Sequence, residues 1–205
     1  MNKTIAITLT FGLGFGLSLT SACDGGGEPA QDPDLAGRYL SDCLSAPQAD
    51  GSTSYFVLDF DIADDAWAVD YTVFGDGTCQ SPLFTVRIDG PYEIGAPSEI
   101  VDGAYEATFA FADKTITPHA QPIVAMLEGM DQCGTEAWVL DQPQSIYATG
   151  CPALGQYPEA SCAADHDLVK LDGDSLQFGA RPANNDMCTA ERRPTALNPV
   201  LFRRQ

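Results

Sequence analysis

The sequence predicts a mainly β fold that is stabilised by disulfides. It consists of an antiparallel sheet and one short helix. Three observations support this prediction. Apolar residues alternate with polar ones over several short runs, turn-forming segments separate these runs, and seven cysteines are spread along the chain. A period of two is typical of half-buried strands, and strands joined by short turns form antiparallel sheets.

The first residues of the chain have the pattern of an export signal. Lys3 precedes an uncharged apolar stretch from Ile5 to Leu19, shorter than the roughly 20 residues that a spanning helix needs. The stretch ends in small residues before Cys23, which resembles the cleavage motif of bacterial lipoproteins. We therefore expect residues 1–22 to be a lipoprotein signal peptide and Cys23 to carry lipid. The alternative is an ordinary secretory signal cleaved nearby, which would leave Cys23 as a spare thiol.

This interpretation divides the rest of the chain into two parts. Residues 23–34 are rich in Gly, Pro and Asp and predict a flexible tether. Residues 35–205 have a length that suits a single domain with a sizeable core. The expected location is the bacterial cell envelope, where the exported protein is anchored to the membrane by its N-terminal lipid and faces the periplasm or the cell surface.

The chain is strongly acidic, with a formal net charge of −19. Its field repels phosphate backbones, which argues against nucleic acid as a partner. An acidic turn offers carboxylates that calcium could use, but the segment lacks the spaced Gly and the terminal Glu of an EF-hand loop. We therefore expect no metal and no other cofactor. The carboxylates at this turn are those of Asp59, Asp61, Asp64 and Asp65.

The cysteines predict a disulfide framework. If Cys23 carries lipid, six cysteines remain, and an even number in an exported chain indicates three bridges among fifteen connectivities. The sequence has no Cys-x-x-Cys pair, so zinc and redox sites lack their usual spacing. We predict pairing between nearest neighbours, which joins Cys43 to Cys79, Cys133 to Cys151 and Cys162 to Cys188.

Two strands are predicted first along the domain. Residues 56–62 alternate apolar side chains with Asp59 and Asp61, which places the carboxylates on a wet face. Residues 63–65 make a polar turn. Residues 67–73 repeat the alternation and predict the hairpin partner of the first strand.

Two further strands follow. Residues 84–88 alternate in the same way until Asp89-Gly90-Pro91, where we expect the strand to break. Residues 105–111 form the fourth amphipathic run. Together the four strands predict an antiparallel meander with one apolar and one wet face.

The C-terminal part mixes a helix, loops and a hairpin. Residues 123–130 predict a helix that is too short to be stable alone and must pack on the sheet. Residues 134–165 contain prolines and scattered glycines, which predict irregular loops held by cysteines. Residues 167–171 and 175–178 flank an Asp-Gly turn and predict a second hairpin.

The apolar face of the sheet is the candidate functional feature. A curved sheet with many aromatic residues either closes around a packed core or leaves a ligand cavity, and the residues alone favour the packed core. If a cavity exists, two methionines of the predicted helix provide an adaptable lid. The predicted ligand-binding residues are Phe56, Leu58, Phe60, Trp67, Val69, Tyr71, Phe84, Val86, Tyr105, Phe109 and Phe111, with Met126 and Met130 as the lid.

No catalytic residues are predicted. The sequence has no Gly-x-Ser-x-Gly motif, its two histidines are His119 and His166, and bridged cysteines leave no free thiol. Among so many carboxylates no acid–base pair stands out. An enzyme would need a cleft where one of the histidines meets a carboxylate.

The order of landmarks along residues 35–205 resembles the adenomatosis polyposis coli down-regulated family, whose animal members are secreted Wnt antagonists. Tyr39 stands where the family usually has Trp, and Leu44 stands where it has Glu. Animal members carry two such domains and a membrane segment, whereas this sequence contains one copy. The matching pieces are Gly37-Arg38-Tyr39, Asp42-Cys43, Phe56-Val57-Leu58, Trp67, Cys79, Pro82-Leu83-Phe84, Gly90, Tyr92, Val101, Gly103-Ala104, Cys133-Gly134, Trp138, Gly150-Cys151-Pro152-Ala153-Leu154-Gly155, Asp167-Leu168-Val169 and Arg192-Arg193-Pro194-Thr195.

The resemblance implies an antiparallel β barrel or half-barrel with an apolar cavity that takes a lipid chain. In the animal proteins this cavity is associated with the acyl group on Wnt. For a bacterial chain the resemblance implies only a lipid, an acylated molecule or another apolar ligand. The alternative function is a structural or protein-interaction module of the envelope with a filled core.

Overall fold

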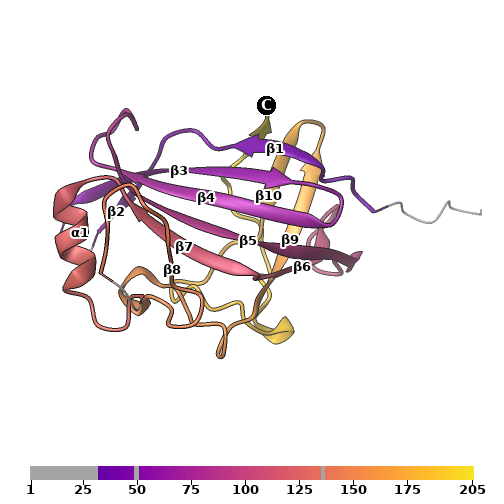
Figure 1. Ribbon diagram of the computed structural model, residues 1–205. Coiled ribbons are helices and arrows are strands. Elements are labelled where there is room, and N and C mark those ends of the chain that lie inside the picture. Colours follow the sequence, from indigo (N-terminus) through magenta and orange to yellow (C-terminus); the bar gives the residue numbers. More distant parts are fainter. Residues whose placement is uncertain (1–31, 49–50, 135–136) are drawn as a thin grey trace, which may run out of the picture. The chain divides into compact units, whose positions relative to one another are not determined.

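All strands in the described part of the chain belong to one antiparallel sheet (Figure 1). The computed structural model describes residues 32–48, 51–134 and 137–205, and Asp32–Gln205 form one compact unit. The predicted signal peptide and Cys23 lie outside the described residues. No helix in the described ranges is both long and apolar enough to cross a membrane.

The elements follow one another with short connections. The described residues of this unit form eleven strands, one α-helix and two short 3₁₀ helices. Their bounds are β1 (Gly37–Leu40), β2 (Leu44–Pro47), β3 (Thr53–Ile62), β4 (Ala66–Phe74), β5 (Pro82–Pro97), β6 (Tyr105–Ala110), β7 (Asp113–Pro118), α1 (Gln121–Glu128), β8 (Gln144–Ser145), η1 (Pro152–Leu154), β9 (Ala164–Asp172), β10 (Ser175–Phe178), η2 (Ala190–Arg192) and β11 (Phe202–Arg204).

Eight of these strands close into a barrel. The order β3-β1-β11-β10-β9-β6-β5-β4 returns to β3, and every pairing is antiparallel. The prediction of a mainly β, antiparallel barrel with one helix is confirmed. Strands from opposite ends of the chain complete the ring, because Tyr39 of β1 pairs with Arg204 of β11. The Arg204 guanidinium also donates a hydrogen bond to the Tyr39 hydroxyl at 2.6 Å.

The two longest strands, β3 and β5, change partners halfway. The first half of β3 pairs with β2 and its second half with β1, while β5 pairs first with β7 and then with β6. The barrel is therefore closed at one end, and its sheet diverges at the other. Figure 1 shows β2 and α1 at the diverging end and β6 and β9 at the opposite end.

The expected break at Asp89-Gly90-Pro91 is wrong, because β5 runs without interruption from Pro82 to Pro97. The pairing with β7 ends at Asp89 and the pairing with β6 begins at Tyr92. Pro91 lies in the gap between these two ladders. A residue without an N–H is tolerated where no ladder bond is made on one side.

The other predicted elements are confirmed, with small shifts. The helix begins at Gln121, earlier than expected, because Pro122 falls in its first turn, where a missing N–H costs nothing. The second hairpin forms between β9 and β10, and Gly173 adopts the left-handed conformation that its tight turn requires.

The three predicted disulfides are also confirmed: Cys43 bonds to Cys79, Cys133 to Cys151, and Cys162 to Cys188.

Two clusters of buried apolar residues occupy the two ends of the barrel. The first cluster is rich in aromatic residues and fills the closed end, and the second lies between the diverging sheet and α1. The first cluster contains Leu35, Tyr39, Phe60, Ile62, Trp67, Val69, Ala107, Phe109, Phe111, Cys162, Val169, Leu176, Phe178 and Phe202. The second contains Val73, Phe84, Val86, Ile116, Val124, Leu127, Cys133, Trp138, Ile146 and Cys151.

Candidate functional site

A cavity of about 430 Å³ lies inside the barrel. Its wall includes members of the first cluster, such as Phe60 and Trp67, and residues that pack on the second cluster, such as Phe56 and Tyr71. This volume falls within the range of roughly 300–1,000 Å³ that is usual for pockets that bind small molecules. The barrel interior is therefore only partly filled by side chains.

Most of the predicted ligand-binding residues come together around this cavity. They occupy inward positions of β3 and β4, together with β6 and the residue that follows it. The predicted residues that line the cavity are Phe56, Leu58, Phe60, Trp67, Val69, Tyr71, Phe109 and Phe111.

The other predicted residues lie elsewhere. Phe84 and Val86 belong to the second cluster, and Tyr105 is partly buried and packs against the first. Met126 is exposed on α1, and Met130 packs against the second cluster. No residue of α1 lines the cavity, so the helix does not form the expected lid. The physical reason is that α1 follows β7 at the diverging end and buries Val124 and Leu127 there.

The closed end of the cavity is formed by interlocked aromatic rings. The rings of Phe60 and Phe178 stack with centroids 4.5 Å apart, and Trp67 meets Phe109 edge to face at 5.0 Å. The Trp67 indole N–H donates to the carbonyl oxygen of Ala110 at 3.2 Å, so its polar atom is satisfied. Such packing fixes the rotamers of the wall and gives a rigid apolar surface.

Three inward residues keep accessible surface in this otherwise buried region. Phe56, Leu58 and Tyr71 are only half-buried, although they lie on cavity-facing positions of β3 and β4. Burial raises the pKa of the Tyr71 hydroxyl, so the phenol stays neutral. These side chains offer apolar surface that a ligand would remove from water.

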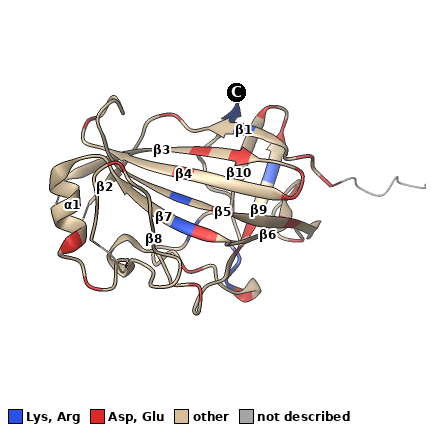
Figure 2. Cartoon of the chain, viewed as in Figure 1, with Lys and Arg blue, Asp and Glu red and all other residues tan. Residues whose placement is uncertain are grey.

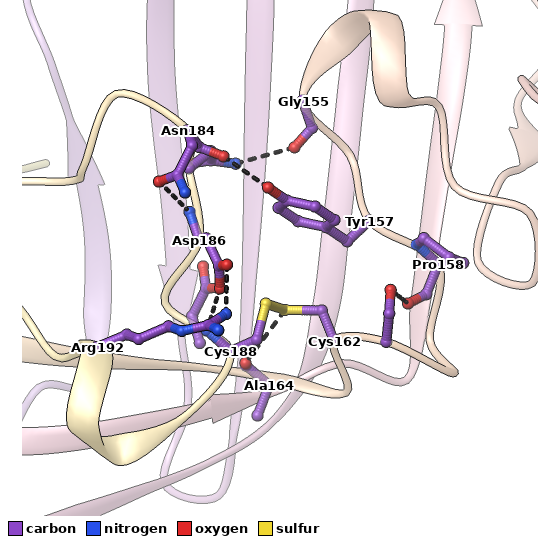
Figure 3. The surroundings of a disulfide bond; sticks show 12 residues. Gly155, Tyr157, Pro158, Cys162, Ala164, Asn184, Asp186, Cys188 and Arg192 are labelled. Carbon is purple, nitrogen blue, oxygen red and sulfur yellow. Dashed lines mark hydrogen bonds and ion pairs between the residues drawn. A yellow bond between two sulfur atoms is a disulfide. The ribbon is translucent and has the colours of Figure 1, made fainter.

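Loops complete the wall on another side of the cavity (Figure 3). The Tyr157 hydroxyl donates to the Asn184 carbonyl oxygen at 2.9 Å, and the Asn185 amide donates to the Gly155 carbonyl oxygen at 3.1 Å. The Cys162–Cys188 bridge joins the same two regions of the chain. The irregular loops expected between residues 134 and 165 thus become part of the site.

A charged wall faces the same cavity. It consists of Lys114 on β7, Asp165 and Asp167 on β9, and Arg181 after β10. Arg181 donates to the Asp165 carboxylate and, at 2.8 Å, to the side-chain oxygen of Asn185. The neighbouring acidic groups raise the pKa of Arg181 against the opposing effect of desolvation, so the guanidinium stays charged.

Burial perturbs two groups of this charged wall. Desolvation lowers the pKa of the Lys114 ammonium to about 8. Desolvation also raises the pKa of the Asp167 carboxyl to about 6, although its Oδ1 accepts hydrogen bonds from the backbone N–H groups of Leu168 and Gly179. Strongly perturbed groups that line one cavity are typical of binding sites.

The perturbed pKa of Asp167 predicts a pH dependence of stability. Its folded-state pKa of about 6 exceeds the ordinary value of 3.8, so folding favours the protonated carboxyl. The contribution is present below pH 4 and is lost as the pH rises through 6, and at about 1.4 kcal/mol per pKa unit it amounts to about 3 kcal/mol. We expect Asp167→Asn, which keeps the Oδ1 acceptor, to remove this loss. Urea unfolding of both proteins at pH 4 and pH 7.5 measures how much the free energy of unfolding changes between the two pH values.

Asp172→Asn controls for the removal of one negative charge, because Asp172 is exposed at the end of the same strand. Parallel pH profiles for the wild type and Asp167→Asn would contradict the prediction.

The sequence prediction missed the charged wall, although a signal for it exists. Lys114, Ile116 and Pro118 alternate with threonines, and β7 buries all three. Likewise Asp165 and Asp167 occupy inward positions of β9. A charged residue at an inward position of an alternating strand is the pattern that identifies such a wall.

The two histidines lie away from the cavity lining. His119 Nδ1 is 3.0 Å from the Asp141 carboxylate, and its Nε2 is 3.0 Å from the Thr85 hydroxyl, beside a second, polar hollow. Thr85 also bonds to Thr72, and the Asp141 side chain is 68% exposed. The contact with Asp141 orients the imidazole, while the Thr85 hydroxyl is hydrogen-bonded to both His119 and Thr72.

His166 Nδ1 contacts the Thr108 hydroxyl at 3.3 Å.

The fold and the cavity define a class of protein: a small, disulfide-bonded antiparallel β barrel with an internal, mainly apolar cavity that is charged on one wall. The chain belongs to the adenomatosis polyposis coli down-regulated family, because the model of the adenomatosis polyposis coli down-regulated 1 domain matches residues 55–168, more than half of its length. This confirms the resemblance to that family. No curated protein matches the sequence.

Proposed function

We propose that the protein is a cell-envelope lipoprotein whose barrel binds an apolar or acyl-chain ligand. The observation that carries this proposal is the 430 Å³ cavity, which is lined mainly by inward apolar residues of the strands and completed by loops and the charged wall. A domain with a purely structural core would fill this space, because protein interiors are close-packed.

The energetics of the cavity favour such a ligand. Each methylene moved from water into an apolar site contributes about 0.8 kcal/mol. Several methylenes against Phe56, Leu58 and Tyr71 would therefore give useful affinity without a catalytic group. The rigid wall of stacked rings limits the conformational entropy that binding costs.

The predicted N-terminal anchor supports the same function. A lipid on Cys23 and the tether predicted over residues 23–34 would hold the barrel near a membrane. The cavity would then be close to a source of acyl chains. The proposal includes no cofactor and no catalytic step.

A cavity-filling variant tests the proposal. Leu58→Trp places a larger side chain in the cavity and should displace about two methylenes of a ligand, which weakens binding about tenfold. Titration of the purified protein with a fluorescent fatty acid measures the affinity. Val57→Trp is the matched control, because Val57 is the neighbouring residue of β3 and does not line the cavity; it should bind as the wild type does.

If the wild-type protein takes up no fatty acid and native mass spectrometry finds no co-purifying lipid, the proposal is wrong. A non-catalytic interaction module of the envelope would then be the better function. Equal affinities for Leu58→Trp and the wild type would place any binding outside the cavity.

A further inference from the structure

Lys114 occupies an inward position of β7, where the strand pattern predicts an apolar residue. It pairs with Ile88 of β5, and the next residues on the same side of β7, Ile116 and Pro118, are buried. The residue is only 3% exposed. Figure 2 shows both basic and acidic colour on β7, and the charged residues of this strand are Asp113 and Lys114.

The Lys114 ammonium is incompletely compensated. It donates one hydrogen bond, to the Tyr157 carbonyl oxygen at 3.2 Å, and lies 3.8 Å from the centroid of the Phe111 ring. An ammonium has three donors. No carboxylate among the described residues makes a salt bridge with its Nζ. A buried cation with unused donors is costly unless something else pairs with it.

The nearby carboxylates already have partners. Asp165 accepts from Arg181, and Asp167 Oδ1 accepts two backbone hydrogen bonds. With all four groups of the charged wall ionised, the wall is neutral, and protonation of Asp167 makes it positive by one unit. The wall can therefore accommodate one additional negative charge beside Lys114.

We propose that the cavity binds a single-chain amphiphile with a carboxylate head group, that is, a free fatty acid, and that the Lys114 ammonium contacts the head group. This inference rests on the proposed function and names the class of ligand. A carboxylate fits better than a doubly charged phosphate, because Asp165 and Asp167 lie on the same wall and would repel the second charge. The apolar rings opposite this wall then hold the chain.

A comparison of two ligands with the same chain tests the inference. Palmitate and methyl palmitate differ in the charge of the head group, and each is measured by displacement of a neutral fluorescent lipid probe. We expect the wild-type protein to bind palmitate at least about tenfold more tightly, since charge-assisted hydrogen bonds are the stronger ones.

Lys114→Met removes the charge at similar length and should abolish this preference, with the affinity for palmitate lowered at least about tenfold. Lys170→Met is the matched control. Lys170 is also a strand lysine that donates to a carbonyl oxygen, that of Asp102 at 3.0 Å, but it does not line the cavity.

The outcomes separate this inference from the proposed function. Equal binding of acid and ester by the wild type, which requires no variant, overturns the inference and leaves the proposed function standing. A preference for the acid that survives Lys114→Met also overturns it. Failure of both ligands to bind overturns the proposed function and the inference together.

Discussion

Gly90→Ala is expected to destabilise the barrel by about 4 kcal/mol or more, or to prevent folding. A Cβ at Gly90 would overlap the carbonyl oxygen of Ala110 and lie 2.9 Å from the Ala112 nitrogen. Both atoms belong to the corner that connects β6 to β7. They are also engaged, because Ala110 accepts from the Trp67 indole and Ala112 donates to Asp89 at 2.8 Å. Backbone in such a corner cannot shift without breaking these bonds.

Gly95→Ala is the matched control in the same strand. Its Cβ would lie 3.4 Å from Glu106, which is an ordinary contact. We therefore expect the free energy of unfolding to change by less than about 1 kcal/mol. Urea unfolding followed by tryptophan fluorescence compares the two variants. If Gly90→Ala unfolds at the same urea concentration as Gly95→Ala, the stability of the barrel does not depend on the close contact between Gly90 and the backbone of Ala110 and Ala112.

Replacement of both Cys162 and Cys188 by Ala is expected to lower stability by about 3–4 kcal/mol. The bridge joins residues 26 positions apart, and the entropy of closing such a loop in the unfolded chain accounts for this magnitude. Because Cys162 also lines the cavity, the same change should weaken the binding of a fluorescent fatty acid. Figure 3 shows the bridge beside the hydrogen-bonded loops that it holds.

The double replacement of Cys43 and Cys79 separates the two effects. That bridge joins residues 36 positions apart and should contribute similar stability, but neither cysteine lines the cavity. Thermal unfolding and ligand titration of both double variants make the comparison. If both variants lose affinity to the same extent, the loss reflects general destabilisation and not the loop wall.

The two ends of the barrel differ in structure. The closed end holds the aromatic wall of the cavity, while the diverging end supports α1 and the second cluster. The family match covers the central strands from β3 through most of β9. The strands that close the ring, β1 and β11, lie outside the matched residues.

Local alternation identified the central strands because it depends only on neighbouring residues. The pattern over residues 56–62 predicts β3, and residues 167–171 with 175–178 predict the β9–β10 hairpin. The shortest strands have no such pattern. β1 and β11 contain four and three residues, too few for a period to be recognised, and they pair with each other from opposite ends of the chain.

Local alternation predicts only some of the cavity residues. Alternation shows which side chains share a face, so Phe56, Leu58 and Phe60 were expected together. Alternation does not show where along a strand its pairing with one neighbour ends and its pairing with another begins. Phe84 and Val86 therefore point inward as expected but fall in the second cluster, because β5 pairs with β7 at that level.

The sequence by itself determined the mainly β class, the central antiparallel strands and the number of disulfides, because these follow from local periodicity and from the number of cysteines, while the structure confirmed the nearest-neighbour pairing. Only the tertiary structure decided that the sheet closes, that β5 passes through Gly90 and Pro91, and that an open cavity remains. It also placed Lys114 and Arg181 on the cavity wall. Closure and cavity volume depend on contacts between distant segments, and no local pattern encodes the distance between them.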